Sequence, residues 1–291
     1  MKINKSEIAV LELLCGATGY SMRELAEKLG GKPAFVSRIV KQLESKALVE
    51  VKKEGVQKNV RLALCDSAQE FKKIHETRGR LQDWLTGAGL DVLVVLCASE
   101  RTPEELAREC DYSRPAMYAA LKRLYSAGVI NKERGLIRVS DEQVKLFVNA
   151  FAQGVMFNCV TEKTRGSVLL KRQGKHLLIV SLQGTPNDEF ELTGVNRLAR
   201  DYGLSGILTN RLAYYHYFGK KKGALKVEDY FIHALALTKQ FYGEDKPLLA
   251  AFLKGHKMDS LKLRVLAKEF GVETDLRELQ SAVGYYDRLG G

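Results

Sequence analysis

Residues 21–51 read SMRELAEKLGGKPAFVSRIVKQLESKALVEV, and this stretch decides the expected fold of the first part of the chain. Ser21, followed three residues later by Glu24, forms a capping-box pattern that predicts the start of a helix. A Gly-Gly-Lys turn follows, and Pro33 suits the first turn of the next helix because its missing N–H is not needed there. The predicted buried face of that helix consists of apolar residues at helical spacing, namely Val36, Ile39, Val40 and Leu43. The stretch therefore predicts two helices joined by a tight turn.

A second stretch repeats this pattern further along the chain. Residues 102–130 read TPEELARECDYSRPAMYAALKRLYSAGVI, with the capping-box pair Thr102 and Glu105 placed 81 positions after the first pair. Ser113 is the predicted cap of the following helix, and Pro115 lies in its first turn. The apolar stripe of that helix is Met117, Ala120, Leu121 and Leu124. Because the two stretches align without a gap, we interpret them as one structural unit used twice.

An alternating segment with a turn follows the last helix of each stretch, and this predicts a β-hairpin. In the first copy the predicted strands are 48–53 and 56–64, with Glu54-Gly55 as the turn. In the second copy they are shorter, 129–132 and 136–139. An apolar helical segment also precedes each stretch, so each copy is expected to contain three helices followed by a hairpin.

The outward face of each third helix carries side chains that can contact base edges or phosphates. In the first copy these are Lys32, Ser37, Arg38, Lys41 and Gln42, and the hairpin adds Lys52, Lys53, Lys58 and Arg61. In the second copy they are Arg114, Tyr118, Lys122 and Arg123, and the hairpin adds Lys132 and Arg134. We predict these residues as the DNA-binding set.

The two stretches quoted above resemble winged helix-turn-helix domains of prokaryotic and archaeal transcription regulators, in the broad MarR-like and ArsR-like group. Together the two copies cover about half of the chain. The resemblance implies a recognition helix in the major groove and a hairpin wing on the DNA backbone. The alternative is that one or both copies are protein-interaction modules, since winged helices also serve in assembly. The short hairpin and the acidic second helix of the second copy make this alternative stronger there.

The distribution of charge agrees with an anionic partner. The chain of 291 residues has a formal net charge of +11, from 46 Lys and Arg against 35 Asp and Glu. Residues 1–85 contribute +5, residues 86–145 contribute zero and residues 146–291 contribute +6. The neutral middle segment combines basic residues in 112–134 with acidic residues just before them, which predicts a basic face backed by an acidic one.

Four parts are expected along the chain: 1–65 and 87–140 as the winged helix-turn-helix domains, 66–86 as a linker helix, and 141–291 as an α+β domain. The linker predicts one helix over 66–85 with a stripe of Phe71, Ile74, Leu81 and Leu85. This stripe is broken at Arg78, so we favour packing on its own domain over a dimer seam. A helix is expected to begin at Ser140, with Gln143 completing its cap.

The last region predicts strands at 156–160, 167–171 and 176–182, followed by helices. The helices are expected at 194–202, 205–217, 227–242, 247–254, 260–270 and 275–288. Residues 227–283 resemble the C-terminal helical part of AbiEi-type antitoxin regulators and related archaeal proteins. That resemblance implies a regulator joined to a nucleotidyltransferase-like, non-catalytic domain, which would serve dimerisation or effector binding.

No enzyme is predicted for this last region. Residues 184–189 lack the serine and the spaced second aspartate that a nucleotidyltransferase would need to hold two metal ions. Neither a Walker lysine motif nor GxGxxG, HExxH or GxSxG occurs in the chain. His216, in an aromatic cluster, and His233, on an apolar helix face, are interpreted as packed or surface histidines. The basic loop of Lys220, Lys221 and Lys222 is a candidate anion-binding site, although such a run is more often a solvated loop.

The expected fold is mainly α with small β wings, consisting of two winged helix-turn-helix domains followed by an α+β domain. Its expected function is a sequence-specific, DNA-binding transcription regulator in the cytoplasm, with double-stranded DNA as partner and no catalytic residue, cofactor, metal or membrane contact. A homodimer and an unidentified small-molecule effector remain open. The alternative functions are an RNA- or protein-complex-binding adaptor and, less favoured, a nucleotide-handling enzyme in the last domain. The cysteines are scattered, which argues against a disulfide framework. No apolar run approaches about 20 residues, so no membrane span is expected. The first 20 residues contain no cleavage site, so no signal peptide is expected.

Overall fold

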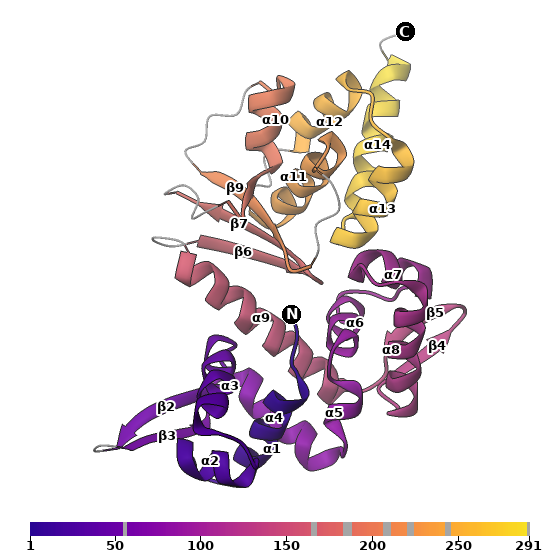
Figure 1. The fold of residues 1–291 in the computed structure, drawn as a ribbon. Coiled ribbons are helices and arrows are strands. Elements are labelled where there is room, and N and C mark those ends of the chain that lie inside the picture. Colours follow the sequence, from indigo (N-terminus) through magenta and orange to yellow (C-terminus); the bar gives the residue numbers. More distant parts are fainter. Residues whose placement is uncertain are drawn as a thin grey trace. The chain divides into compact units, whose positions relative to one another are not determined.

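A computed structural model describes residues 1–54, 57–163, 168–182, 188–205, 211–219, 224–241 and 246–289. The chain forms two compact units, Met1–Glu162 and Lys163–Gly291, each with its own hydrophobic core (Figure 1). The fold is mainly helical with small antiparallel sheets, as the sequence predicted. Within the described residues, no helix combines the length and the apolar character needed to cross a bilayer.

The first copy of the repeat contains three helices and a hairpin, in the predicted order. Its elements are α1 (Lys5–Cys15), β1 (Tyr20–Ser21), α2 (Met22–Lys28), α3 (Pro33–Ser45), β2 (Val49–Glu54) and β3 (Gln57–Leu62). The predicted capping box begins α2, since the Glu24 N–H donates to the Ser21 hydroxyl and the Ser21 N–H donates to the Glu24 carboxylate. The strands form an antiparallel sheet in the order β1-β3-β2.

The second copy has the same order of helices and a shorter hairpin. Its elements are α6 (Ala88–Leu96), α7 (Pro103–Cys110), α8 (Arg114–Ser126), β4 (Ile130–Glu133) and β5 (Leu136–Val139). A single antiparallel bridge from Arg101 to Ile137 stands where β1 pairs with β3 in the first copy. Ser113 occupies the N-cap of α8 as predicted, but its side chain makes no capping hydrogen bond. The apolar stripes predicted for α3 and α8 are buried in full.

The third helix of each copy ends in the same way. The Leu48 N–H donates to the Leu43 carbonyl, and the Val129 N–H donates to the Leu124 carbonyl, as in a Schellman motif. This ending needs a left-handed residue, which is Gly128 at φ +67° in the second copy and Ala47 at φ +55° in the first. The shared ending supports the interpretation of the two stretches as one repeated unit.

The long helix α9 (Glu142–Lys163) belongs with the two copies and differs from prediction in three ways. Its Phe147 and Phe151 lie in the core of the N-terminal unit, so the second unit begins at Lys163 and not at residue 141. The segment 156–160, predicted as a strand, continues the helix, because the apolar spacing that starts at Val144 persists through it. Its cap is Asp141, whose side chain accepts the Val144 N–H at 2.9 Å, and not Ser140.

The linker predicted as one helix over 66–85 is two helices, α4 (Asp66–Thr77) and α5 (Leu81–Trp84). The break lies at Arg78-Gly79-Arg80, where Arg78 is extended and Arg80 is left-handed. Arg78 donates to the Ala127 carbonyl at 2.8 Å and pairs with Asp141, so its tertiary partners stabilise the break. The apolar stripe of the linker is buried in the core of its own unit, as the favoured interpretation predicted.

The second unit contains one four-stranded antiparallel sheet in the order β6-β7-β9-β8. The strands are β6 (Val168–Gln173), β7 (His176–Ser181), β8 (Glu191–Leu192) and β9 (Leu212–Tyr217). The helices are α10 (Gly194–Tyr202), α11 (Val227–Phe241), α12 (Lys246–Gly255), α13 (Ser260–Phe270) and α14 (Glu273–Leu289). The predicted helix over 205–217 is wrong at β9. There, alternation places Ala213 and Tyr215 in the core, and tyrosine favours strands.

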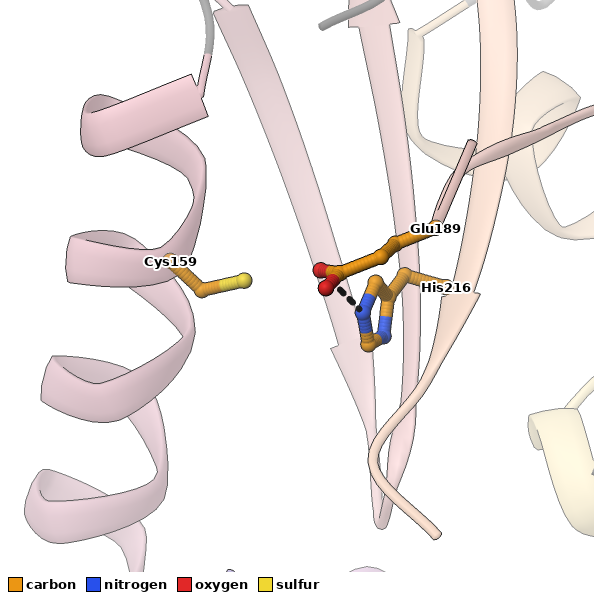
Figure 2. A group of neighbouring side chains, drawn as sticks. All are labelled: Cys159, Glu189 and His216. Atoms are coloured by element: carbon orange, nitrogen blue, oxygen red, sulfur yellow. Dashed lines mark ion pairs between the residues drawn. The ribbon is translucent and has the colours of Figure 1, made fainter. Parts of the chain in front are cut away.

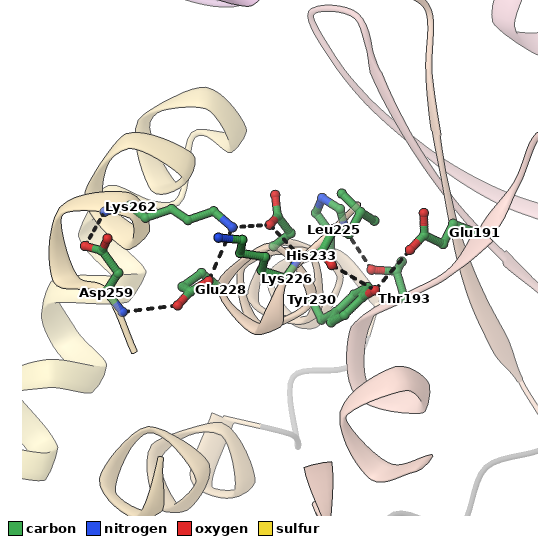
Figure 3. Close-up of polar contacts among 10 residues, drawn as sticks. Glu191, Thr193, Leu225, Lys226, Glu228, Tyr230, His233, Asp259 and Lys262 are labelled. Atoms are coloured by element: carbon green, nitrogen blue, oxygen red, sulfur yellow. Dashed lines mark hydrogen bonds and ion pairs between the residues drawn. The ribbon is translucent and has the colours of Figure 1, made fainter. Parts of the chain in front are cut away.

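A polar network surrounds the first turns of α11 (Figure 3). The Tyr230 hydroxyl donates to Glu191 of β8 at 3.0 Å, and Lys262 of α13 pairs with Glu228 at 3.3 Å. His233 is buried and shares a 2.7 Å hydrogen bond with the Thr193 hydroxyl. These contacts connect α11 to the sheet and to α13, and they agree with the interpretation of His233 as a core histidine.

Replacing Thr102 by Ala is expected to destabilise the N-terminal unit by about 1 kcal/mol. The change removes the hydroxyl that accepts the Glu105 N–H at 3.2 Å at the start of α7. Urea unfolding followed by the fluorescence of Trp84, the single tryptophan of the chain, reports on this unit because Trp84 lies in its core. Thr102→Ser keeps the hydroxyl and should remain within a few tenths of a kcal/mol of the parent. Equal losses for both variants would contradict the capping role.

Candidate nucleic-acid interface

The exposed face of α3 brings together the predicted residues of the first copy. Its five predicted side chains, Lys32, Ser37, Arg38, Lys41 and Gln42, are all exposed. Arg38 stacks over the exposed ring of Phe35, with 5.6 Å from its guanidinium carbon to the ring centroid. In the described part of the chain, neither Arg38 nor Lys41 has a carboxylate within ion-pair distance. Their donors therefore face solvent and can serve a ligand.

The hairpin β2–β3 adds three exposed lysines near its tip. Lys53 and Lys58 stand directly opposite each other across the two strands, and Lys52 is next to Lys53. Like charges in directly opposed positions destabilise a hairpin, so an anion between or beside them would relieve this repulsion. Arg61 differs from the prediction, because it is half-buried and its Nε lies 2.5 Å from the carboxylate of its cross-strand partner Glu50. We therefore remove Arg61 from the set of free cations.

The corresponding face of α8 is exposed as predicted, but more of its side chains have protein partners. The Tyr118 hydroxyl donates to the Glu104 carboxylate at 3.4 Å, and Arg123 donates to the Asp83 carbonyl at 3.3 Å. Arg114 and Lys122 are exposed on the same helix. The face is thus basic and aromatic, whereas the α3 face is basic and polar.

The second hairpin places Arg134 at its tip. Arg134 and Gly135 are the two turn residues and have φ of +51° and +86°, the pair of positive values that a type I′ turn requires. Arginine is uncommon at such a position, where Asn, Asp or Gly is favoured. Lys132 and Arg134 are both exposed, so the hairpin presents two cations.

The acidic residues of α7 do not cancel the basic face of α8. Glu105 completes the capping box at the start of α7. Glu109 is buried and pairs with the buried Arg101, with 3.0 Å between the carboxylate and Nε. Glu104 is the acidic residue of α7 that remains exposed beside Tyr118. The acidic segment therefore contributes mostly to capping and to the core.

Two cations near α8 were absent from the predicted set. Arg78 and Arg80, from the break between α4 and α5, line one cleft together with Lys122 and Arg123. The sequence signal was the Arg-Gly-Arg run inside an otherwise helical pattern. This run lies far from α8 in the sequence, so the sequence alone did not indicate that Arg78 and Arg80 line the same cleft as α8.

Lys220, Lys221 and Lys222, the candidate anion-binding loop, lie outside the described residues. A cleft at residues 188–192 is acidic, and Glu189 faces His216 of β9 across 3.6 Å (Figure 2). His216 also packs against Phe190 and Phe218, with centroid distances of 4.9 and 4.6 Å. This cleft carries the wrong sign of charge for a nucleic acid.

The geometry defines the class of candidate site as an exposed cationic surface formed by a helix and a hairpin, present twice in one unit. No protein-family model matches this chain, and no curated protein matches its sequence. The function proposed next is supported by the residues and contacts described above.

Proposed function

We propose that this protein is a sequence-specific regulator that binds double-stranded DNA through the winged helix-turn-helix unit of its first copy. The observation that carries the proposal is the α3 face, where Arg38 and Lys41 are exposed beside a hairpin whose tip opposes Lys53 and Lys58. A helix of this size fits the major groove, and a basic hairpin beside it reaches the backbone. In this arrangement α3 is the recognition helix and β2–β3 is the wing.

The side chains of α3 divide into two roles by their chemistry. Arg38 and Gln42 can each make two hydrogen bonds to one base, arginine to guanine and glutamine to adenine. Lys32 and Lys41, as point charges, suit phosphates, and so do the hairpin lysines. Stacking on Phe35 restricts the Arg38 guanidinium before DNA arrives, which lowers the entropy lost on binding.

The two copies form one unit with a continuous core, so their relation to each other is fixed within the chain. Their exposed faces differ, since α3 presents Ser37 and Gln42 where α8 presents Tyr118 and Arg123. The two faces therefore suit different parts of a DNA target, and we assign duplex recognition to α3, whose basic helix and hairpin carry the proposal. The second unit of the chain would then serve dimerisation or effector binding.

Arg38→Ala is expected to weaken binding to a selected DNA site by about 5- to 150-fold and to relax the preference at one base pair. Lys41→Ala should weaken binding to all sequences about equally and reduce the slope of log affinity against log salt by about 1. Gel-shift titrations of genomic fragments at several salt concentrations measure both quantities.

Arg23→Ala is the matched control for these variants. Arg23 is an exposed arginine of the same copy, but it lies on α2 and already pairs with Glu27 at 3.1 Å. Its removal should leave the affinity for the selected site unchanged. Equal binding to every fragment would refute sequence-specific recognition, and preferential binding of RNA would support the alternative of an adaptor.

A further inference from the structure

Two clefts lie next to each other on the exposed side of α8 and share Lys122 and Ser126. The first is lined by basic side chains from the break between α4 and α5 and from α8. The second is lined by aromatic and apolar side chains from α7, α8 and the hairpin β4–β5. One strand of a polymer with charged and aromatic groups would be able to contact both clefts, since they meet at the same two residues.

The first cleft, the basic cleft, has the charge required for a phosphate. Its cations are Arg78, Arg80, Lys122 and Arg123. Two carboxylates oppose them, since Asp141 pairs with Arg78 and Asp83 lies 3.3 Å from Arg80. The Arg80 and Asp83 side chains are both exposed, so their pair is weak and can open toward an anion. The balance leaves an excess of two positive charges in the basic cleft.

The second cleft, the aromatic cleft, has exposed rings on an apolar floor. Tyr118 is 51% exposed and Tyr125 is 37% exposed, and they are seven residues apart, so both lie on one side of α8. The floor is formed by Pro103, Leu121 and Ile137, while Lys122 and Lys132 stand among the lining residues. Burial raises the pKa of the Tyr125 hydroxyl, so this group is still further from ionisation at neutral pH than a free tyrosine, which is itself neutral there.

The first copy shows that the repeated fold does not require these rings. At the positions 81 residues earlier, Ser37 stands for Tyr118, Glu44 stands for Tyr125 and Val51 stands for Lys132. A serine and a glutamate cannot stack on a base, and the glutamate would repel a phosphate. Exposed rings at these two positions are thus a property of the second copy alone.

We propose that the α8 face binds single-stranded DNA, with bases stacked on Tyr118 and Tyr125 and the backbone phosphates in the basic cleft. Proteins that hold an unpaired strand combine these two elements, a cationic groove for the backbone and aromatic rings for the bases. This inference rests on the proposed function for its class of partner, a DNA. It assigns the two copies different forms of that partner: α3 takes duplex and α8 takes an unpaired strand.

The test measures the fluorescence anisotropy of a labelled oligo-dT strand of about 12 nucleotides with the full chain. Tyr118→Ala and Tyr125→Ala should each weaken binding of this strand by about 5- to 150-fold. Tyr118→Phe and Tyr125→Phe keep the rings and should bind as the parent does. Loss of binding in the Phe variants equal to that in the Ala variants, or no loss in the Ala variants, would overturn the proposal.

The basic cleft is tested by salt dependence in the same assay. Arg123→Gln should lower the slope of log affinity against log salt by about 0.7, the value for one phosphate contact on a single strand. An unchanged slope would refute a phosphate in this cleft. An oligo-U RNA that binds more tightly than oligo-dT through the same tyrosines would refute the assignment to DNA.

The first copy supplies the variant that separates this inference from the proposed function. Arg38→Ala with Lys41→Ala should weaken duplex binding and leave the oligo-dT affinity unchanged, and the tyrosine variants should do the reverse. Retained duplex binding with no strand binding would refute the inference alone. Strand binding through the tyrosines with no duplex binding by α3 would refute the proposed function alone. Trp84 fluorescence, compared for all variants, shows that each remains folded.

Discussion

Glu109→Gln lowers the free energy of unfolding of the N-terminal unit by about 3–5 kcal/mol, because it leaves the Arg101 charge buried without its counter-charge. The Arg101 side chain is 1% exposed and that of Glu109 is 3% exposed, with 3.0 Å between Nε and the carboxylate. Arg101 also donates to the Glu100 carbonyl at 3.1 Å. This carbonyl and the Ser99 hydroxyl, which also accepts from Arg101, are neutral acceptors that remain in the variant but cannot replace the carboxylate.

Urea unfolding monitored by Trp84 fluorescence measures this loss, since the ion pair and Trp84 belong to the same unit. The control is the double variant Arg101→Met with Glu109→Leu, which removes both charges and keeps most of the volume. We expect it to be much closer to the parent than Glu109→Gln, because two apolar groups leave no charge to desolvate. A double variant as unstable as the single one would attribute the loss to packing and not to the unpaired charge.

The first copy has a different pair of residues at the positions that correspond to Arg101 and Glu109. Tyr20 and Lys28 stand 81 residues before Arg101 and Glu109, and the Lys28 ammonium lies 5.0 Å from the centroid of the Tyr20 ring. In the first copy the cation is the second residue of the pair, Lys28. In the second copy it is the first residue, Arg101. The repeat therefore has a contact between these two positions in both copies, a cation–π pair of half-buried Tyr20 and exposed Lys28 in the first and a buried ion pair in the second.

Local signals made the helices of the N-terminal unit predictable. The capping boxes at Ser21 and Thr102 and the apolar stripes of α3 and α8 depend on residues within four positions of one another, which the sequence shows directly. The errors occurred where a short apolar or aromatic run fits both periodicities. Residues 156–160 continue a helix and 212–217 form a strand, and only the packing of the neighbouring elements decides between them.

The composition of the candidate site was less predictable than its location. The exposure of Arg38 and Lys41 followed from the periodicity of α3. The pairing of Arg61 with Glu50 required the register of β2 and β3. The presence of Arg80 and Lys122 in the lining of one cleft required the path of the linker. These arrangements bring together residues that are distant in sequence, so local sequence patterns do not predict them.

Phe147→Ala is expected to destabilise the N-terminal unit by about 3–5 kcal/mol, the cost of a cavity left by a phenyl ring in a core. Phe147 is fully buried in α9, with its ring centroid 5.7 Å from that of Phe71 in an edge-to-face arrangement and 5.8 Å from that of Phe151. Leu146→Ala, one residue away, is the matched control. Leu146 is 49% exposed, and its loss should cost no more than about 0.5 kcal/mol.

The same variant tests whether α9 unites the two copies. Phe147 belongs to the one core that includes α3, α8 and the linker, so its loss weakens both copies together. Duplex binding through α3 and strand binding through α8 should then fail at the same urea concentration, and that concentration should be lower than in the parent. Failure of one activity at a lower urea concentration than the other would show that the copies unfold separately. A loss of stability of no more than about 0.5 kcal/mol, the range of surface substitutions, would place α9 outside this core.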